Sequence, residues 1–167
     1  YKRIIDDGFE ICEKIDTLLS TDRVVQRSKG VGLLVQGLTQ TVERVNPDFL
    51  MVLGDREESI AVSIVGNYMN KLVIHIGGGD PVYGNADDPI RFATSKLSHV
   101  HFVTSKYSAR RVHQMGEESW RIKLVGAPNL DTLKSVGVLL EEKLQQEIGI
   151  GPIKHLRLVT VHPETNN

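Results

Sequence analysis

Short apolar segments alternate along this chain with segments of helical character, and this alternation restricts the folds that it can adopt. The apolar runs have the length of β-strands, and we predict strands at 49–54, 71–76, 99–105 and 120–126. The segments around them favour helices, which we predict at 24–45, 57–69, 87–98 and 106–116. Strands joined by helices in this order form a parallel sheet. The predicted fold class is therefore α/β, with a doubly wound parallel sheet.

Two local features of these elements lead to further predictions. The segments FLMVLG (49–54) and KLVIHI (71–76) are predominantly apolar, which is typical of strands buried on both faces of a sheet. In the helix predicted at 87–98, Asp88 directly precedes Pro89. We expect Asp88 to cap this helix and Pro89 to lie in its first turn.

The region from 130 to 151 differs in character, because it is more charged, has a helical pattern and ends in GIGP. Another apolar run, LRLVTVH (156–162), follows it. We predict an N-terminal Rossmann-like domain over 1–136, incomplete at its start, a linker helix region over 137–155, and the first strand of a second domain over 156–167. A lone opening strand cannot bury its own faces, so we expect this chain to be a fragment.

Charge and cysteine content exclude several classes of function. With 20 Lys and Arg against 21 Asp and Glu, the formal net charge is −1, and the basic residues form no block, which argues against a nucleic-acid partner. No apolar run in the sequence approaches the roughly 20 residues of a transmembrane helix, so we expect no membrane partner. Cys12 is the single cysteine, which excludes an internal disulfide and a cysteine-rich metal site. These features are typical of a cytoplasmic protein.

The residues that follow the predicted strands carry most of the candidate chemistry. Ligands of an open parallel sheet bind beyond the carboxyl ends of its strands. In this chain those ends are the segments 54–56, 77–80, 104–105, 126–128 and 162–165. The amino ends carry ordinary turn residues, and this asymmetry predicts a binding site at the carboxyl edge of the sheet.

Three residue types at this edge indicate what the site would hold. The glycine run 77–79 allows backbone N–H groups to approach phosphate or sugar oxygens. The guanidinium of Arg56 matches the paired oxygens of a diphosphate. Several carboxylates accompany them, and like charges in one pocket drive pKa values apart, which separates an acid from a base. These carboxylates are Asp55, Asp80, Asp87 and Asp88.

Five motifs, taken in order, resemble one enzyme family. They are VLGDREE, VIHIGGGD, NADDPIRFATSKLSHVHF, VGAPNLDTL and TVHPET. Together they resemble the hydrolysing UDP-N-acetylglucosamine 2-epimerases, in particular the branch that feeds sialic acid synthesis. The resemblance implies a glycosyltransferase-B-type fold, in which two Rossmann-like halves enclose the active site and the C-terminal half binds UDP. It also implies a homodimer with no cofactor and no catalytic metal.

The resemblance implies a specific reaction as well. The family converts UDP-N-acetylglucosamine and water to UDP and N-acetylmannosamine. The C2 proton is removed as UDP leaves C1, which gives a 2-acetamidoglucal, and water then adds at C1 while C2 is reprotonated from the other face. This chemistry requires acid and base groups near both faces of the sugar. We expect this activity, with a UDP-sugar as the binding partner, in the whole protein and no turnover in the fragment alone.

Site roles carry over from the family position by position. The resemblance implies catalytic roles for Asp55, Asp80, Asp87 and His162. It implies substrate-binding roles for a second set, namely Arg56, Gly78, Gly79, Asp88, Arg91 and Glu164.

Three positions depart from the family pattern. Asp80 stands where the family usually has Glu, Gly77 where relatives often have Glu or His, and Phe92 where they have His. Two other hypotheses therefore stay open. One is a glycosyltransferase of the same architecture, and the other is a decayed homologue that binds sugar nucleotide without turnover.

Structural roles compete with functional ones at several positions. Asp55 would serve as the cap of the helix that begins near Glu57. Glycines 77–79 would form a tight turn. His99 and His101 lie on one face of a predicted strand, but no third ligand is suitably spaced, so we expect no metal there.

Overall fold

The computed structural model describes residues 1–19, 24–82, 87–151 and 157–161 of the 167-residue chain. The chain divides into two units, residues 1–127 and 128–167. The helices of the first unit are α1 (Lys2–Asp6), α2 (Val24–Val45), α3 (Glu57–Tyr68), α4 (Asp87–Lys96), α5 (Lys106–Gln114) and the 3-10 turn η1 (Ser119–Arg121). Its strands are β1 (Phe49–Leu53), β2 (Leu72–Ile76), β3 (Val100–Val103) and β4 (Ile122–Leu124).

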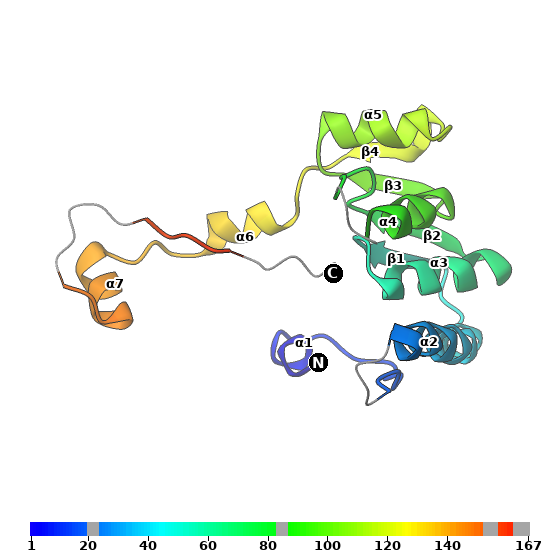
Figure 1. Ribbon diagram of the computed structural model, residues 1–167, viewed down its shortest axis with the longest axis horizontal. Coiled ribbons are helices and arrows are strands. Elements are labelled where there is room, and N and C mark those ends of the chain that lie inside the picture. The colour runs from blue at the N-terminus through cyan, green and yellow to red at the C-terminus, as the bar shows by residue number, and fades with distance from the viewer. Residues whose placement is uncertain (20–23, 83–86, 152–156, 162–167) are drawn as a thin grey trace. The chain divides into compact units, whose positions relative to one another are not determined.

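The four strands form one parallel sheet in the order β1-β2-β3-β4 (Figure 1). A helix connects each neighbouring pair, since α3 follows β1, α4 follows β2 and α5 follows β3. Crossovers of this kind are what parallel pairing requires. The predicted α/β class, its parallel sheet and the order of its elements are confirmed. The strands are shorter than predicted, because β1, β3 and β4 end earlier and β2, β3 and β4 begin later than the predicted bounds.

The core lies on one face of this sheet. Helix α3 packs on β1 and β2, and α5 packs on β3 and β4. The side chains beneath the helices are almost fully buried, namely Val52, Val73, His75, His101 and Val103. Side chains on the opposite face remain exposed, with Phe49 at 51%, Leu53 at 68% and Leu72 at 42%.

The prediction that 49–54 and 71–76 are buried on both faces is therefore wrong for this chain. The apolar runs themselves are present, but burial depends on what covers the sheet, and the helices that contact the strands pack on the other face. No described helix combines the length and the apolar character that crossing a membrane requires.

The described part of the second unit contains two helices, α6 (Asn129–Ser135) and α7 (Glu141–Ile148). The helical character predicted for 130–151 is interrupted at 136–140, and this break begins with Val136, Gly137 and Val138, which are weak helix formers. Helix α7 ends at Ile148, and Gly149, with a φ of 68°, forms the left-handed cap that glycine favours.

The strand predicted at 156–162 is not formed over its described residues, 157–161. Leu158 is 90% exposed and Val161 is 82% exposed. A strand needs a neighbour to pair its backbone N–H and C=O groups, and the described part of the chain provides none at this position. Residues 156 and 162 lie outside the described residues.

Candidate functional site

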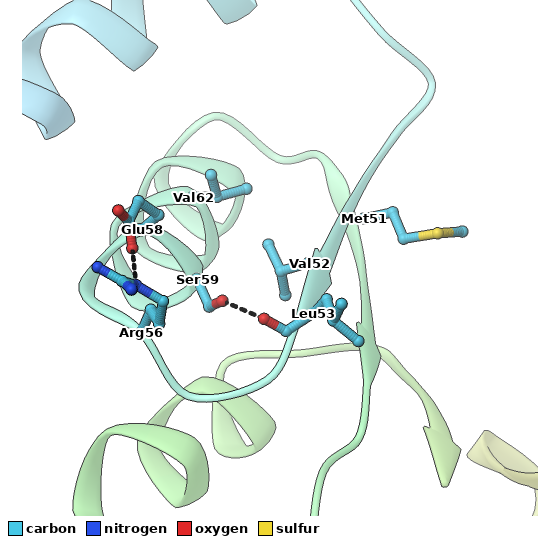
Figure 2. Close-up of a pocket in the computed structure, with 7 residues that line it drawn as sticks. All are labelled: Met51, Val52, Leu53, Arg56, Glu58, Ser59 and Val62. Atoms are coloured by element: carbon cyan, nitrogen blue, oxygen red, sulfur yellow. Dashed lines mark hydrogen bonds and ion pairs between the residues drawn. The ribbon is translucent and has the colours of Figure 1, made fainter. Parts of the chain in front are cut away.

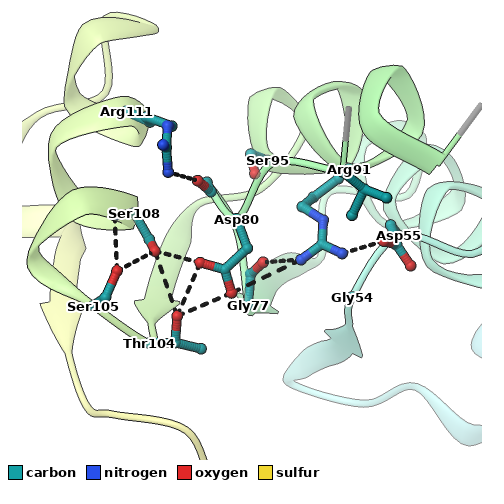
Figure 3. Close-up of polar contacts among 12 residues, drawn as sticks. Gly54, Asp55, Gly77, Asp80, Arg91, Ser95, Thr104, Ser105, Ser108 and Arg111 are labelled. Atoms are coloured by element: carbon teal, nitrogen blue, oxygen red, sulfur yellow. Dashed lines mark hydrogen bonds and ion pairs between the residues drawn. The ribbon is translucent and has the colours of Figure 1, made fainter. Parts of the chain in front are cut away.

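Two carboxylates and an arginine from three different elements meet at the carboxyl edge of the sheet (Figure 3). Asp55 follows β1, Asp80 follows β2, and Arg91 lies on α4. Arg91 donates through Nη2 to Asp55 and through Nη1 to the Gly77 carbonyl at 3.0 Å. Its Nη1 also lies 3.9 Å from the Asp80 carboxylate. The Arg91 side chain is only 12% exposed, so the contacts of its guanidinium with both carboxylates are partly shielded from solvent.

Asp80 is held on its other side by hydroxyl groups. Thr104 Oγ1 lies 2.9 Å from each of the two carboxylate oxygens, and Ser108 Oγ donates to one of them. Ser105 caps α5, because its Oγ accepts from the Ser108 N–H at 3.1 Å. Asp80 therefore lies against the first turn of α5, where the helix dipole favours a negative charge. Arg111, also on α5, donates to the Gly79 carbonyl at 3.2 Å.

Sequence reasoning missed Ser108 and Arg111 as members of this cluster. A signal was available, because Ser105 stands directly before a predicted helix and Ser108 follows three residues later, within the first turn. What local spacing does not reveal is that Asp80, 28 residues from Ser108, reaches this turn.

A fully buried histidine lies beneath the cluster. His75 Nε2 is 2.8 Å from the Gly54 carbonyl, and Nδ1 is 3.0 Å from Ser95 Oγ. A carbonyl can only accept, so Nε2 carries the proton and Nδ1 accepts from Ser95. Burial lowers the pKa of His75 to about 4, although the bond to Gly54 opposes this shift. The ring is therefore neutral near pH 7.

The Arg56 side chain, unlike that of Arg91, binds Glu58 and makes no hydrogen bond or ion pair with Asp55 or Asp80 among the described residues. Its Nε donates to Glu58 at 3.2 Å, its side chain is 72% exposed, and it lines a hollow beside β1 (Figure 2). Arg56 is also the N-cap residue of α3, and no side chain caps that helix. Asp55 is therefore not the cap of α3, and its carboxylate binds Arg91 instead. Of the two predicted arginines, the structure brings Arg91 to the carboxylates.

Glycines 77–79 are required by the backbone conformation and the close packing of their loop. Gly77 and Gly79 have φ values of +80° and +81°, which side-chain-bearing residues rarely adopt. A Cβ at Gly78 would lie 2.7 Å from Ser95 Oγ, so the loop packs closely on α4. The Gly77 N–H donates to the Phe102 carbonyl at 2.9 Å. The turn role is thus present, and ligand binding by Gly78 and Gly79 stays a prediction.

The acidic pair opens α4. This helix begins at Asp87, so Asp88 lies within its first turn and the prediction that Asp88 is the cap is wrong. The reason is that the Asp88 carboxylate accepts the Val82 N–H at 2.9 Å, which fastens the preceding loop to the helix. His162 and Glu164 lie outside the described residues, so their predicted roles stay predictions.

A buried charge cluster lies at the amino end of the same sheet. Glu117 is 2% exposed and contacts Lys96 at 2.7 Å, Arg121 at 2.8 Å and His101 at 3.3 Å. His99 Nδ1 accepts the Val73 N–H at 3.0 Å. Both histidines of the HVH segment thus have structural partners. Across the described ranges no three His, Cys, Asp or Glu side chains are arranged to hold a metal ion.

The chain is similar to proteins of one enzyme family. The family model for UDP-N-acetylglucosamine 2-epimerase matches residues 1–167. The chain belongs to the UDP-N-acetylglucosamine 2-epimerase family. This epimerase chain is 34% identical, over its whole length, to the hydrolysing GDP/UDP-N,N'-diacetylbacillosamine 2-epimerase of Campylobacter jejuni, of which it covers 43%. It is 36% identical over 94% of its length to the hydrolysing UDP-N,N'-diacetylbacillosamine 2-epimerase of Legionella pneumophila, of which it covers 41%.

The epimerase fold is found in solved structures as well. The Neisseria meningitidis UDP-N-acetylglucosamine 2-epimerase bound to UDP-N-acetylglucosamine matches with a TM-score of 0.64 and 22% identity. The match covers 79% of this chain and 38% of that one. Such neighbours are of the glycosyltransferase-B type, which confirms the predicted fold class. The chain thus spans about two fifths of the length of the relatives that it matches.

Proposed function

We propose that the protein containing this chain is a hydrolysing 2-epimerase of UDP-2-acetamido sugars. The observation that carries the proposal is the meeting of Asp55 and Asp80 around Arg91 at the carboxyl edge, in a chain of the epimerase family. The substrate predicted from the sequence is UDP-N-acetylglucosamine. The products are then UDP and N-acetylmannosamine, formed through a 2-acetamidoglucal.

The positions of two carboxylates support a mechanism of elimination and re-addition. One group must remove the C2 proton and another must return a proton to the opposite face. Asp55 and Asp80 extend from neighbouring strand ends and contact different atoms of one guanidinium, so two carboxylates face one site without direct contact to each other. We assign these two groups to proton transfer at C2. Asp87 and His162 are assigned to the departure of UDP, with Arg56, Gly78, Gly79, Asp88, Arg91 and Glu164 as substrate contacts.

A second substrate is favoured by a specific observation. The Campylobacter and Legionella relatives, at 34% and 36% identity, are named for N,N'-diacetylbacillosamine. A UDP-linked diacetamido-trideoxyhexose is therefore the alternative, and it undergoes the same chemistry at C2. The family match favours either epimerase over a glycosyltransferase of the same architecture.

The cellular location and the partners of the proposed enzyme are further parts of the proposal. We propose a cytoplasmic homodimer whose partner is the UDP-sugar, with neither nucleic acid nor membrane involved. The domain assignment predicted above, with a linker at 137–155 and a UDP-binding half beginning at 156, belongs to this proposal. On that basis the 167-residue chain alone is inactive.

The test is UDP release from each of the two UDP-sugars by the whole protein, measured by anion-exchange chromatography. We expect release from one or both, and a loss of at least about a thousandfold in Asp55→Asn, because an amide cannot accept the C2 proton. Asp48→Asn is the matched control, since Asp48 is exposed at the amino end of the same strand. Absence of UDP release from both sugars would contradict the proposed function, and an active Asp55→Asn would contradict the role of Asp55.

A further inference from the structure

The His75 ring is fully buried, and its two nitrogens bond to Gly54 and Ser95, which belong to elements that carry the proposed site. We propose that His75, together with Ser95, is a positioning residue that sets the orientation of the Asp55 carboxylate. This inference rests on the proposed function, because it concerns the efficiency of proton transfer at C2. His75 lies on β2 and Ser95 lies on α4, and both are 0% exposed.

Gly54, the residue that precedes Asp55, is held by β2 through both its backbone N–H and its carbonyl. The Gly54 N–H donates to the Ile76 carbonyl at 2.9 Å, and the Gly54 carbonyl accepts from His75 Nε2 at 2.8 Å. Gly54 has a φ of +78°, so this turn has a left-handed residue immediately before Asp55. With its preceding peptide fixed in this way, Asp55 has its backbone direction set before any side-chain contact forms.

The second nitrogen of His75 ties the same turn to α4. Ser95 stands four residues after Arg91, one helical turn further along the same face. Arg91 in turn binds the Asp55 carboxylate. The contacts therefore close a ring that runs from Asp55 through Arg91, α4, Ser95, His75 and Gly54 back to Asp55. Figure 3 shows the side of this ring that runs from Asp55 through Arg91 to Ser95 on α4. A shift at His75 would move both the carboxylate and the guanidinium that holds it.

The loop that carries Asp80 rests on the same pair. A Cβ built at Gly78 would lie 2.7 Å from Ser95 Oγ and 3.0 Å from His75 Nδ1, which is closer than such contacts normally are. The glycine at 78 thus lets the 77–80 loop approach the pair. His75 and Ser95 thus contact all three parts of the site. His75 bonds to the turn that precedes Asp55, the 77–80 loop packs on both side chains, and Ser95 lies on the same helix as Arg91.

The directional bonds of this histidine distinguish it from simple core packing. A leucine of similar size would fill the space without desolvating two polar nitrogens, but it would leave the Gly54 carbonyl and the Ser95 hydroxyl without these bonds. Misplacement of a reacting group by about 1 Å is enough to slow a reaction by roughly a hundredfold. His75 is the residue whose bonds prevent such a shift at Asp55.

The test compares three His75 variants in the whole protein with a matched histidine. In Gln the terminal amide reaches the position of Nε2, so His75→Gln keeps the donor to Gly54, whereas His75→Asn and His75→Leu remove it. His101 is the control because it pairs in register with His75 on β3 and is equally buried, but bonds to Glu117 at the opposite edge. The readouts are kcat, KM, the thermal midpoint and the kinetic isotope effect with substrate deuterated at C2.

We expect His75→Asn and His75→Leu to lower kcat by 30- to 300-fold with KM changed less than threefold, and to raise the isotope effect. His75→Gln should stay within fivefold of the wild type, and His101→Asn should lower the thermal midpoint without changing kcat of the folded enzyme or its isotope effect. If His75→Asn does not fold, Ser95→Ala provides the second test, with a three- to tenfold loss of kcat expected. Equal kcat losses in His75→Gln and His75→Asn, or in His75→Asn and His101→Asn, would overturn the positioning role.

The same experiment separates this inference from the function on which it rests. A wild-type protein that releases no UDP from either UDP-sugar overturns the proposed function and this role with it. A wild-type protein that is active while its His75 variants lose only stability overturns the positioning role alone.

Discussion

Arg91 is the side chain around which the candidate site is arranged. Each of its two terminal nitrogens has a carbonyl or carboxylate partner, and its buried Nε has no hydrogen-bond partner among the described residues. The fork of the guanidinium holds Asp55 in place while leaving Asp80 within 3.9 Å. A residue with a single charged atom would not keep these three contacts together.

We expect Arg91→Lys to lower kcat by roughly 10- to 100-fold, because lysine keeps the charge but cannot hold Asp55 and the Gly77 carbonyl with a planar fork. Steady-state kinetics of the whole protein measure this. Arg27→Lys is the matched control, since Arg27 pairs with Glu57 at 3.0 Å but is 63% exposed. It should change kcat less than twofold. An Arg91→Lys enzyme as active as the wild type would show that the fork is unimportant.

At the scale of elements, the covered face of the sheet is notable for its buried polar groups. His75 and His101 lie side by side on β2 and β3, and Glu117 binds His101. Burial lowers the pKa of both histidines. Burial also raises the pKa of Glu117, but the bond from Lys96 and the charge of Arg121 outweigh it, so this pKa lies below its usual value. Because all three pKa values are lowered, each of these groups binds a proton more weakly in the folded state than in the unfolded state.

The stability of the protein should therefore fall in mild acid. The unfolded chain protonates His75 near pH 6.5, whereas the folded chain does so only near pH 4, so the free energy of unfolding decreases as pH falls between these values. His75 alone contributes a loss on the order of 3 kcal/mol across this window. Glu117 adds a loss below its usual pKa of about 4.5.

Urea unfolding at a series of pH values between 4 and 7 measures this slope. His75→Gln should make the curve flatter, because it removes one group whose protonation is linked to unfolding. A free energy of unfolding that stays constant from pH 7 to pH 4 would contradict the burial of neutral histidines.

The loop between β2 and α4 should be intolerant of side chains where it packs on α5. Gly79 and Gly126 both have positive φ, at +81° and +84°, but a Cβ at Gly79 would clash with the Ser108 backbone, whereas at Gly126 nothing lies within 4 Å. We expect Gly126→Ala to cost about 1 kcal/mol from backbone strain, and Gly79→Ala to cost roughly 2 kcal/mol or more. Thermal or urea unfolding of the two variants provides the comparison, and equal costs would contradict the packing described here.

The elements of this fold were predictable because strand and helix periods are local properties of the sequence. Burial on both faces was not, because the exposure of Phe49 depends on what covers the sheet. The cluster was predictable only in part, since Asp55 and Arg91 are 36 residues apart and a local pattern suits Asp55 to a helix cap equally well. His75 and Ser95 have the pattern of core residues, and the bond from His75 to Gly54 depends on the register of β1 and β2.

At the scale of the whole molecule, we propose that the described sheet presents one half of a binding site. The chain covers 41% and 43% of its Legionella and Campylobacter relatives, and the fold class is one in which two Rossmann-like halves face each other. In our proposal this half supplies the proton-transfer groups and the other half binds UDP. Turnover is then a property of the whole protein.

Proton NMR of the whole protein in D2O tests this account most directly, with UDP-N-acetylglucosamine and the UDP-diacetamido sugar as parallel substrates. We predict free UDP together with a 2-epimeric sugar that carries deuterium at C2, because the carboxylate that returns the proton exchanges with solvent. A product that retains protium at C2 would contradict proton transfer by Asp55 and Asp80, and an epimerised UDP-sugar formed without free UDP would contradict the hydrolysing reaction.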